Sequence, residues 1–242
     1  MAESLKDRVA LVVGASSGIG RETARLLARE GARVMATARR ADRLQSLQVE
    51  MAAEGFAIGV VAADASNCEE MDRLAERTRE EIGDVEILVY ATGTNTPDRA
   101  MSRLRVKEWD RMMSVNLDGA FYITQALLPK MRAAGTGLLI YISSISGLRP
   151  DVSGAAYQAA KRGLLGLAHA VLVEEGKNGI RTSVVCPGLV DTEILDLRPE
   201  KPTKETLAKA LRPEDVAEIA VAIAKLPRRA VVPELQIVPT YL

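Results

Sequence analysis

Short hydrophobic runs alternate with longer amphipathic stretches along the whole chain. Apolar runs without polar alternation are typical of strands buried on both faces, as in a parallel sheet covered by helices. When each run is followed by a helical stretch, the repeat predicts consecutive β-α-β units, and hence an α/β fold with a seven-stranded parallel sheet flanked by helices. The expected strands cover residues 9–14, 33–38, 57–64, 86–93, 138–144, 182–188 and 235–239.

Two signals mark helix starts. Ser66 with Glu69 three residues later forms a capping-box pattern before a helix over 67–82, and Pro213 suits the first turn of a helix over 213–226. Residues 193–210, rich in charges and containing two prolines, interrupt the rhythm and are expected to form a mobile flap over a substrate. Without a repeat or linker, we expect one domain over residues 1–242.

Composition narrows the function classes. Lys and Arg together number 32, as do Asp and Glu, so we expect neither a nucleic-acid nor a membrane partner. Two cysteines and one histidine supply too few ligands for a structural zinc site, and no metal is expected. The N-terminal apolar run is short and leads directly into glycines, unlike a signal peptide, so we expect a cytoplasmic protein.

A glycine-rich loop follows the first expected strand. Glycines in this place allow a sharp turn and let a pyrophosphate approach the amides at a helix N-terminus, where the helix dipole is positive. The spacing GxxxGxG differs from the commoner GxGxxG, and an ordinary tight turn is the alternative. Its position favours a doubly wound, Rossmann-type domain that binds a dinucleotide. The loop contacts would come from Gly14, Ser16, Ser17, Gly18, Ile19 and Gly20.

The end of the second strand bears on the choice of nucleotide. An acidic residue there binds a ribose 2′-hydroxyl, whereas an arginine suits a 2′-phosphate. Arg39 and Arg40 stand at this point without a carboxylate, so NADP(H) is predicted as the cofactor, with NAD(H) as the less favoured alternative. Solvated charges at a helix start are the simpler alternative for both arginines.

Tyr157 and Lys161 lie four residues apart in the stretch YQAAK, which places them on one face of a helix. A nearby ammonium is expected to lower the pKa of the phenol toward neutrality and so make it a general acid and base. A surface pair is the alternative. Ser144 ends a strand at the carboxyl edge of the sheet, where open α/β sheets bind ligands, and favours the catalytic interpretation.

The ordered set of GxxxGIG, Asn116, Ser144, YxxxK and Pro187-Gly188 resembles the short-chain dehydrogenase/reductase family from about Lys6 to the C-terminus. The resemblance implies a tetrad in which Tyr157 is the general acid and base. Lys161 would lower its pKa and bind the nicotinamide ribose, Ser144 would position the substrate oxygen, and Asn116 would hold a water molecule. It also implies a homodimer or homotetramer. The implied cofactor contacts are the loop residues together with Asp64, Gly93, Tyr157, Lys161, Pro187, Gly188 and Thr192.

Two stretches depart from the family pattern. Val13 replaces a threonine, and Tyr90-Ala91-Thr92-Gly93 replaces Asn-Asn-Ala-Gly, so hydrogen bonds that steady the strand beside the cofactor are expected to be missing. For Arg149 two interpretations stay open, a residue that binds an anionic group of the substrate or an exposed loop residue. The candidate substrate-pocket residues are Thr94, Asn95, Ser146, Leu148, Arg149, Val152, Leu189 and the flap.

These features together predict an oxidoreductase that transfers hydride between NADP(H) and a carbonyl or secondary alcohol, with a ketone or a 3-oxoacyl compound as substrate. A catalytically silent NADP-binding sensor or scaffold is the alternative. A methyltransferase of similar fold is disfavoured, because it has no need of YxxxK.

Overall fold

Seven parallel strands form one sheet in the order β3-β2-β1-β4-β5-β6-β7 in a computed structural model that describes residues 2–241. The predicted fold class is therefore confirmed. The chain crosses from β3 at one edge back to β4 beside β1, so β1 and β4 flank the point where the strand order reverses. The strands are β1 (Val9–Val13), β2 (Arg33–Ala38), β3 (Ile58–Ala62), β4 (Ile87–Tyr90), β5 (Gly137–Ile142), β6 (Ile180–Pro187) and β7 (Glu234–Ile237).

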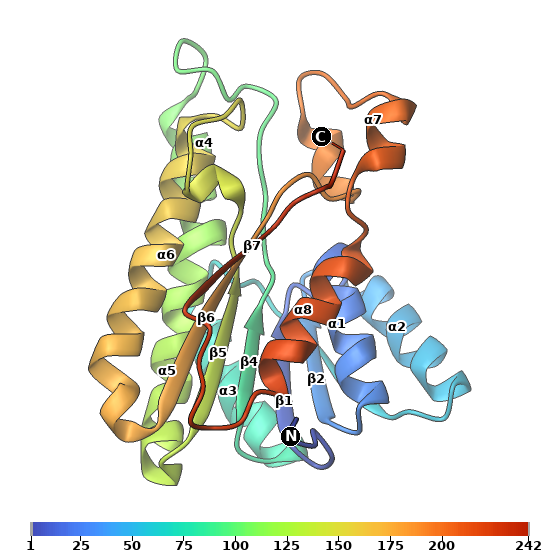
Figure 1. Cartoon of the computed structure of the whole chain (residues 1–242), viewed down its shortest axis with the longest axis vertical. Coiled ribbons are helices and arrows are strands. Elements are labelled where there is room, and N and C mark those ends of the chain that lie inside the picture. The colour runs from blue at the N-terminus through green and yellow to red at the C-terminus, as the bar shows by residue number, and fades with distance from the viewer. Residues whose placement is uncertain (1, 242) are drawn as a thin grey trace.

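Helices cover both faces of the sheet, and each face has its own apolar core (Figure 1). On one face pack α1 (Gly18–Arg29), α2 (Ala41–Ala53) and α8 (Pro213–Ala224). On the other pack α3 (Cys68–Ile82), α5 (Gly119–Ala134) and α6 (Ala155–Glu175). The central strands are buried on both faces, which explains their unbroken apolar runs.

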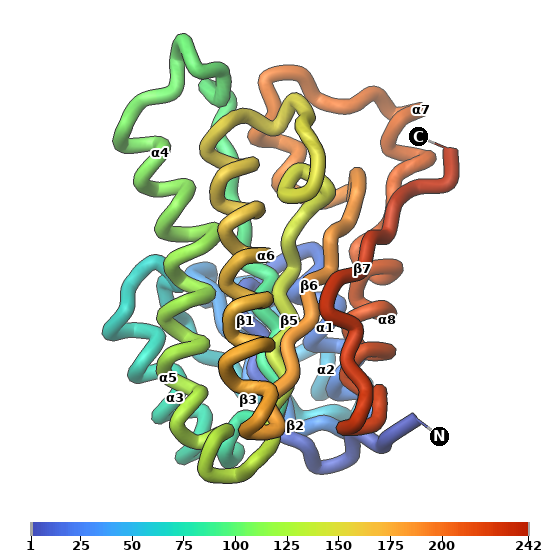
Figure 2. Tube along the Cα trace, turned by 60° about the vertical axis from the view of Figure 1, so that its left-hand side comes forward, coloured from blue at the N-terminus to red at the C-terminus, as the bar shows by residue number. Residues whose placement is uncertain are grey.

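Helices α5 and α6 run side by side along the sheet (Figure 2). Near their C-terminal ends Arg132 Nε donates to Glu175 Oε2 at 2.8 Å. A short α4 (Val106–Met113) leads through η1 (Ser114–Asp118), a π-helical turn, into α5. No helix among residues 2–241 is long and apolar enough to cross a membrane.

The predicted capping box at Ser66 and Glu69 is wrong. Asn67 caps α3, because its side-chain oxygen accepts a hydrogen bond from the amide of Glu70 at 3.2 Å. The hydroxyl of Ser66 instead donates to Asp64 Oδ1 at 2.8 Å. The bond to Asp64 directs the Ser66 hydroxyl away from the helix, and Asn67, one residue later, takes the capping position.

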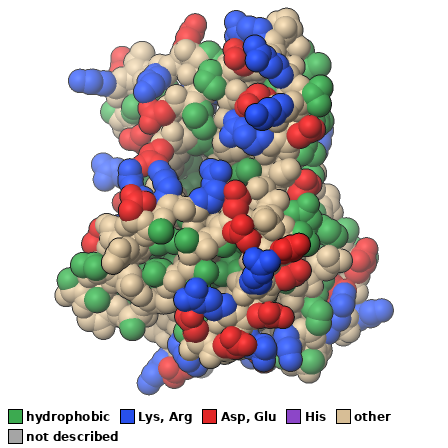
Figure 3. All heavy atoms as spheres, turned by 180° about the vertical axis from the view of Figure 1, so that it is seen from behind, with side chains coloured by type: hydrophobic (Ala, Val, Ile, Leu, Met, Phe, Trp, Pro, Cys, Tyr) green, Lys and Arg blue, Asp and Glu red, His purple; other side chains and the backbone are tan. Residues whose placement is uncertain are grey.

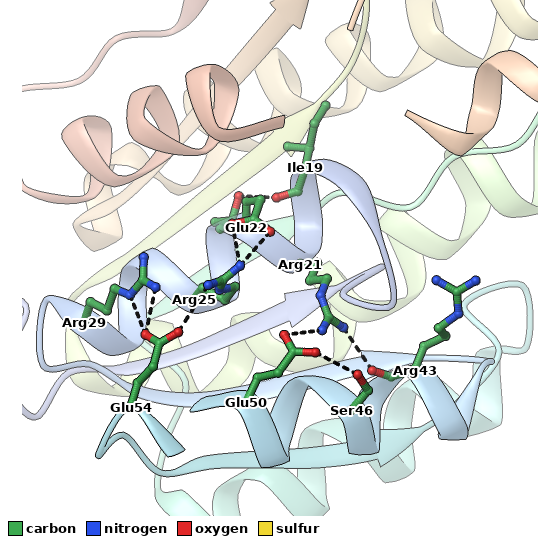
Figure 4. A network of polar contacts seen from close by, with 10 residues as sticks. Ile19, Arg21, Glu22, Arg25, Arg29, Arg43, Ser46, Glu50 and Glu54 are labelled. Carbon is green, nitrogen blue, oxygen red and sulfur yellow. Dashed lines mark hydrogen bonds and ion pairs between the residues drawn. The ribbon is translucent and has the colours of Figure 1, made fainter. Parts of the chain in front are cut away.

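Ion pairs between α1 and α2 fix these two helices against each other (Figure 4). Arg21 Nη2 lies 2.6 Å from Glu50 Oε2, and Arg29 Nη2 lies 2.7 Å from Glu54 Oε2. Exposed pairs contribute at most about 1 kcal/mol each, so the apolar core remains the main source of stability. These pairs hold the C-terminal part of α2 against α1, and at the start of α2 Arg21 Nη1 donates to the Arg43 carbonyl oxygen at 3.1 Å.

The segment 193–210 contains η4 (Glu193–Leu197), a 3₁₀ turn, and α7 (Lys204–Lys209). At its base Val190 pairs with Leu211, and the amide of Asp191 donates to the Leu211 carbonyl oxygen at 2.8 Å. The segment is thus an excursion closed at its two ends. Its predicted mobility stays a prediction.

Candidate active site

A cleft of about 530 Å³ opens at the carboxyl ends of the strands. The loops after β1, β2, β3, β4, β5 and β6 line it, and η4 contributes a further wall. Parallel sheets of this kind bind ligands at this edge, beside the point where strand order reverses. In Figure 3 a hollow crosses the middle of the face shown, and Lys and Arg side chains gather along it.

The glycine loop has a conformation that larger residues cannot adopt. Gly14 has φ +97°, and a Cβ there would lie 2.8 Å from the backbone of Ala91 and Thr92. Of the predicted loop contacts, Gly14, Ser16, Ser17, Gly18 and Ile19 line the cleft. Gly20 does not line it, because this residue packs against the carbonyl oxygen of Gly14.

The N-terminus of α1 opens on the cleft and has no side-chain cap. Ser17 occupies the N-cap position, but no side chain caps the first amides, and the first turn has no acidic residue. The Ser17 hydroxyl instead accepts a hydrogen bond from Arg40 Nη2 at 2.6 Å. Uncapped amides and the positive end of the helix dipole favour a phosphate.

The two arginines that were predicted together differ in position. The guanidinium of Arg40 lies against the glycine loop, with Nε 3.1 Å from Ser16 Oγ and Nη1 2.7 Å from Glu193 Oε2. Arg39 is more exposed and lies 3.9 Å from Asp64. The hydrogen bond from Arg40 lowers the pKa of Glu193. Arg40 is therefore the better placed of the two to hold a phosphate beside the loop.

The remaining predicted cofactor contacts also line the cleft: Asp64, Gly93, Pro187, Gly188 and Thr192. A Cβ on Gly18 would lie 3.1 Å from Thr192 Cγ2, so η4 approaches the loop closely. A Cβ on Gly93 would lie 3.5 Å from Asn116 Oδ1 and 3.7 Å from Lys161 Nζ. A glycine at position 93 therefore leaves space between these two polar groups.

Ser144, Tyr157 and Lys161 come together in the same cleft. Ser144 follows β5, and the other two lie on α6. Lys161 Nζ lies 5.7 Å from the centre of the Tyr157 ring and donates to the Ile142 carbonyl oxygen at 3.0 Å. Ser144 Oγ donates to Ser146 Oγ at 3.1 Å. The pair on α6 thus shares one face, as the spacing predicts.

The predicted lowering of the Tyr157 pKa is wrong for the chain by itself. Burial raises the pKa of Tyr157 to about 12, and Ser144, Arg198 and Arg99 oppose this only in part. Burial also lowers the pKa of Lys161 to about 8. Loss of solvent disfavours the charged form of both groups and is the largest cause of each shift. At neutral pH Tyr157 carries its proton, and most Lys161 side chains are charged.

Asn116 lies outside the cleft lining. Its side chain is fully buried in η1, where Oδ1 accepts from the Thr94 amide at 2.9 Å and Nδ2 donates to the Met112 carbonyl oxygen at 2.9 Å. Asn116 therefore fixes the loop after β4. Its predicted role toward a water molecule stays a prediction.

Comparison with known proteins identifies the family. The family model for short chain dehydrogenases matches residues 8–203. The chain belongs to the short-chain dehydrogenase/reductase family, as the motifs predict. Its members are oxidoreductases.

One relative is an uncharacterized oxidoreductase of Staphylococcus aureus strain USA300, 34% identical over 97% of this chain and 98% of the relative. A metagenomic short-chain oxidoreductase solved in complex with NADP superimposes with a TM-score of 0.85 at 31% identity, over 99% of this chain and 100% of that chain. An alcohol dehydrogenase from the archaeon Thermococcus sibiricus, complexed with 5-hydroxy-NADP, has a TM-score of 0.86 at 30% identity, with 97% of each chain covered.

This short-chain dehydrogenase compensates for one departure from the family pattern. The hydroxyl of Tyr90, which replaces an asparagine, donates to the Val115 carbonyl oxygen at 2.7 Å. Val115 lies in η1 next to Asn116, so the strand beside the cleft keeps a side-chain link to this turn. The sequence predicted a loss of side-chain hydrogen bonds here, and the bond from Tyr90 replaces one of them.

Its cleft contains substrate-side residues that the sequence did not indicate. Thr94, Asn95, Ser146 and Leu189 line the cleft as predicted, but Leu148, Arg149 and Val152 do not. Arg149 and Val152 are exposed instead. The predicted flap also lines the cleft, through residues that include Leu195, Leu197 and Arg198. The lining residues that the sequence did not indicate include Arg99, Asp151 and Ser153, which come from two separate loops. Among the described residues, no group of three or more His, Cys, Asp or Glu is placed to hold a metal ion.

Proposed function

We propose that this protein transfers hydride between NADP(H) and a carbonyl or secondary alcohol, and acts on a ketone or a 3-oxoacyl compound. The observation that carries the proposal is that one cleft holds the glycine loop together with Ser144, Tyr157 and Lys161. The NADP complexes of two similar structures support the choice of cofactor.

The residues present fit this cofactor. The Gly14 backbone leaves no room for a side chain, and the uncapped start of α1 faces the same cleft, so the loop would hold the pyrophosphate. Arg40 would hold the 2′-phosphate, with Ser16 and Ser17 beside it. When bound, NADPH supplies the hydride.

In the direction of reduction, Tyr157 donates its proton to the substrate oxygen, and Ser144 donates a hydrogen bond to the same atom. A phenol with a pKa near 12 retains its proton until negative charge develops on that oxygen. Lys161, held by the Ile142 carbonyl group, then stabilises the tyrosinate that forms. Reverse transfer oxidises the alcohol. Asn116 would keep the loop after β4 in place.

Replacing Tyr157 by phenylalanine tests the proposal. We expect kcat to fall by about two to four orders of magnitude, because a positioned acid is lost, while NADPH binding measured by calorimetry is retained. Tyr122→Phe on α5, which lies outside the cleft lining, is the matched control and should retain activity. Substrates would be ketones, aldehydes, quinones and 3-oxoacyl thioesters, followed by NADPH absorbance.

Normal turnover in Tyr157→Phe would overturn the assignment. NADPH binding without turnover of any substrate in wild-type protein would instead support the sensor interpretation. The homodimer or homotetramer also stays a prediction, and light scattering after size-exclusion chromatography would test it.

A further inference from the structure

Arg99 is an unusual residue for the substrate side of this cleft because it is only 8% exposed. Its Nε donates to the Thr96 carbonyl oxygen at 3.1 Å, and its Nη2 donates to the Leu197 carbonyl oxygen at 2.7 Å. These two bonds fix the plane of the guanidinium group. Nη1 has no hydrogen-bond acceptor among residues 2–241 and is not among the fully buried polar atoms, so it can bind a group in the cleft.

Arg198 brings a second positive charge into the same region. Its guanidinium group forms no hydrogen bond or ion pair with any of residues 2–241. Both arginines line the cleft, and the bond from Arg99 to the Leu197 carbonyl oxygen places it next to the residue before Arg198. Burial lowers the pKa of Arg99, the like charge of Arg198 lowers it further by repulsion, and the charge of Asp151 opposes this in part. An anion between them would remove this repulsion.

The nearby carboxylate of Asp151 does not fill that role. Its Oδ1 accepts from the amide of Ser153 at 2.8 Å, and Oδ2 accepts from the hydroxyl groups of Ser146 and Ser153. Asp151 forms no ion pair with either arginine in the described part of the chain. Against the one charge of Asp151 stand Arg99, Arg198 and Lys161, so this end of the cleft is positive.

We propose that Arg99 and Arg198 form a subsite for an anionic group of the substrate, a carboxylate or a phosphate, on a molecule that also carries the reacting carbonyl. This inference rests on the proposed function and specifies its substrate class. We do not assign Arg99 and Arg198 to the phosphates of the cofactor. The groups suited to those phosphates lie around Ser16 and Ser17, whereas both arginines act electrostatically on the Tyr157 hydroxyl.

A purely structural role is the alternative for Arg99, because its bond to Leu197 ties the loop after β4 to η4. The Arg198 side chain forms no such bond among the described residues, so replacing it tests anion binding without breaking the link between the loop and η4. A charge-assisted hydrogen bond to a substrate is worth enough to change kcat/KM by about tenfold or more.

Matched substrate pairs test the subsite in wild-type protein with NADPH. We would compare 4-oxopentanoate with its methyl ester, and dihydroxyacetone phosphate with dihydroxyacetone. In at least one pair the anion should have a kcat/KM at least about tenfold higher, mainly through a lower KM. The pair that shows the preference distinguishes a carboxylate from a phosphate. Equal or better turnover of the neutral partner in both pairs would overturn the inference and leave the proposed function intact.

Variants then locate the effect. Arg198→Gln should lower the anion-to-neutral ratio of kcat/KM at least about tenfold, and Arg198→Lys should restore part of it. Arg149→Gln, an exposed arginine outside the cleft lining, is the control and should leave the ratio unchanged. An unchanged ratio in folded Arg198→Gln protein would refute the subsite.

Calorimetric binding of 4-oxopentanoate and dihydroxyacetone phosphate in the presence of NADP⁺ gives a readout that does not depend on turnover. Tighter binding of an anion than of its neutral partner, lost in Arg198→Gln, supports the subsite even if no substrate is reduced. No turnover of any compound, with anion binding retained, would count against the proposed reaction alone. No preference in binding or turnover would count against the subsite.

Discussion

Cofactor preference should depend on Arg40 more than on Arg39, although the two residues are adjacent in the sequence. Arg40 contacts Ser16 and Ser17 of the glycine loop, whereas Arg39 is 63% exposed and lies 3.9 Å from Asp64. A hydrogen bond between a guanidinium group and a phosphate contributes about 1.5–3 kcal/mol, or about 10- to 150-fold in affinity.

The lower end of that range is expected, because the phosphate competes with Glu193. The side chain of Arg40 is 43% exposed and that of Glu193 is 46% exposed. An exposed ion pair of this kind is worth about 0–1 kcal/mol, which reduces the net gain. Arg40→Gln should therefore lower the NADPH-to-NADH ratio of kcat/KM by about tenfold, and Arg39→Gln by less than about threefold.

Initial rates with each cofactor at a fixed ketone concentration measure this ratio, and calorimetric titration gives the two dissociation constants directly. Arg73→Gln, a surface arginine paired with Glu69 on α3, controls for loss of positive charge. If Arg40→Gln keeps the wild-type ratio, or if Arg39→Gln changes the ratio more, the assignment of the 2′-phosphate contact is refuted.

Three stability predictions follow from buried or constrained groups, each measured by urea unfolding. Gly14→Ala should lower the free energy of unfolding more than twice as much as Gly55→Ala. At both positions φ is positive, which costs an alanine about 1 kcal/mol or more, but only at Gly14 would the added Cβ meet backbone atoms. Equal losses would contradict this. Lys161→Met should stabilise the protein at pH 7 by up to about 3 kcal/mol, because burial lowers the lysine pKa to about 8 from about 10.4 in the unfolded chain. Between the two pKa values the unfolded state binds more protons than the folded state, so the stability of the wild type rises with pH there. The difference in stability between the variant and the wild type therefore shrinks. A variant that is less stable than the wild type at pH 7 would refute the argument. Tyr90→Phe should cost about 1 kcal/mol through loss of the bond to Val115, and an unchanged unfolding midpoint would show that this bond contributes nothing.

The sheet and its family could be predicted because their signals are local. The first two strands, β1 and β2, were expected at 9–14 and 33–38 and are found at Val9–Val13 and Arg33–Ala38. A strand that is buried on both faces has an unbroken apolar run, and this run can be recognised in the sequence without knowledge of the tertiary contacts. The spacing of Tyr157 and Lys161 likewise fixes their shared face through helix geometry alone.

Quantities that depend on surroundings were predicted less well. The spacing of Tyr157 and Lys161 indicates attraction between a phenol and an ammonium, but it does not reveal how much water each group loses. Lys161 is only 3% exposed, and desolvation is the largest cause of the shift in its pKa and in that of Tyr157. The cap of α3 shows the same limit, because the choice between Ser66 and Asn67 depends on the carboxylate of Asp64.

The substrate side of the cleft shows why proximity in sequence can mislead. Arg149 lies eight residues before Tyr157, yet it points into solvent, whereas Arg99 and Arg198 reach the cleft from loops that the fold brings together. The bond from Arg99 to the Leu197 carbonyl group joins those loops, and the next residue along the chain is Arg198. Two cations that a fold holds together without a protein carboxylate between them require compensation by solvent or by a ligand. Because the Tyr157 hydroxyl lies in the field of both, the charge of the substrate would, in the proposed reaction, become part of the environment in which Tyr157 gives up its proton.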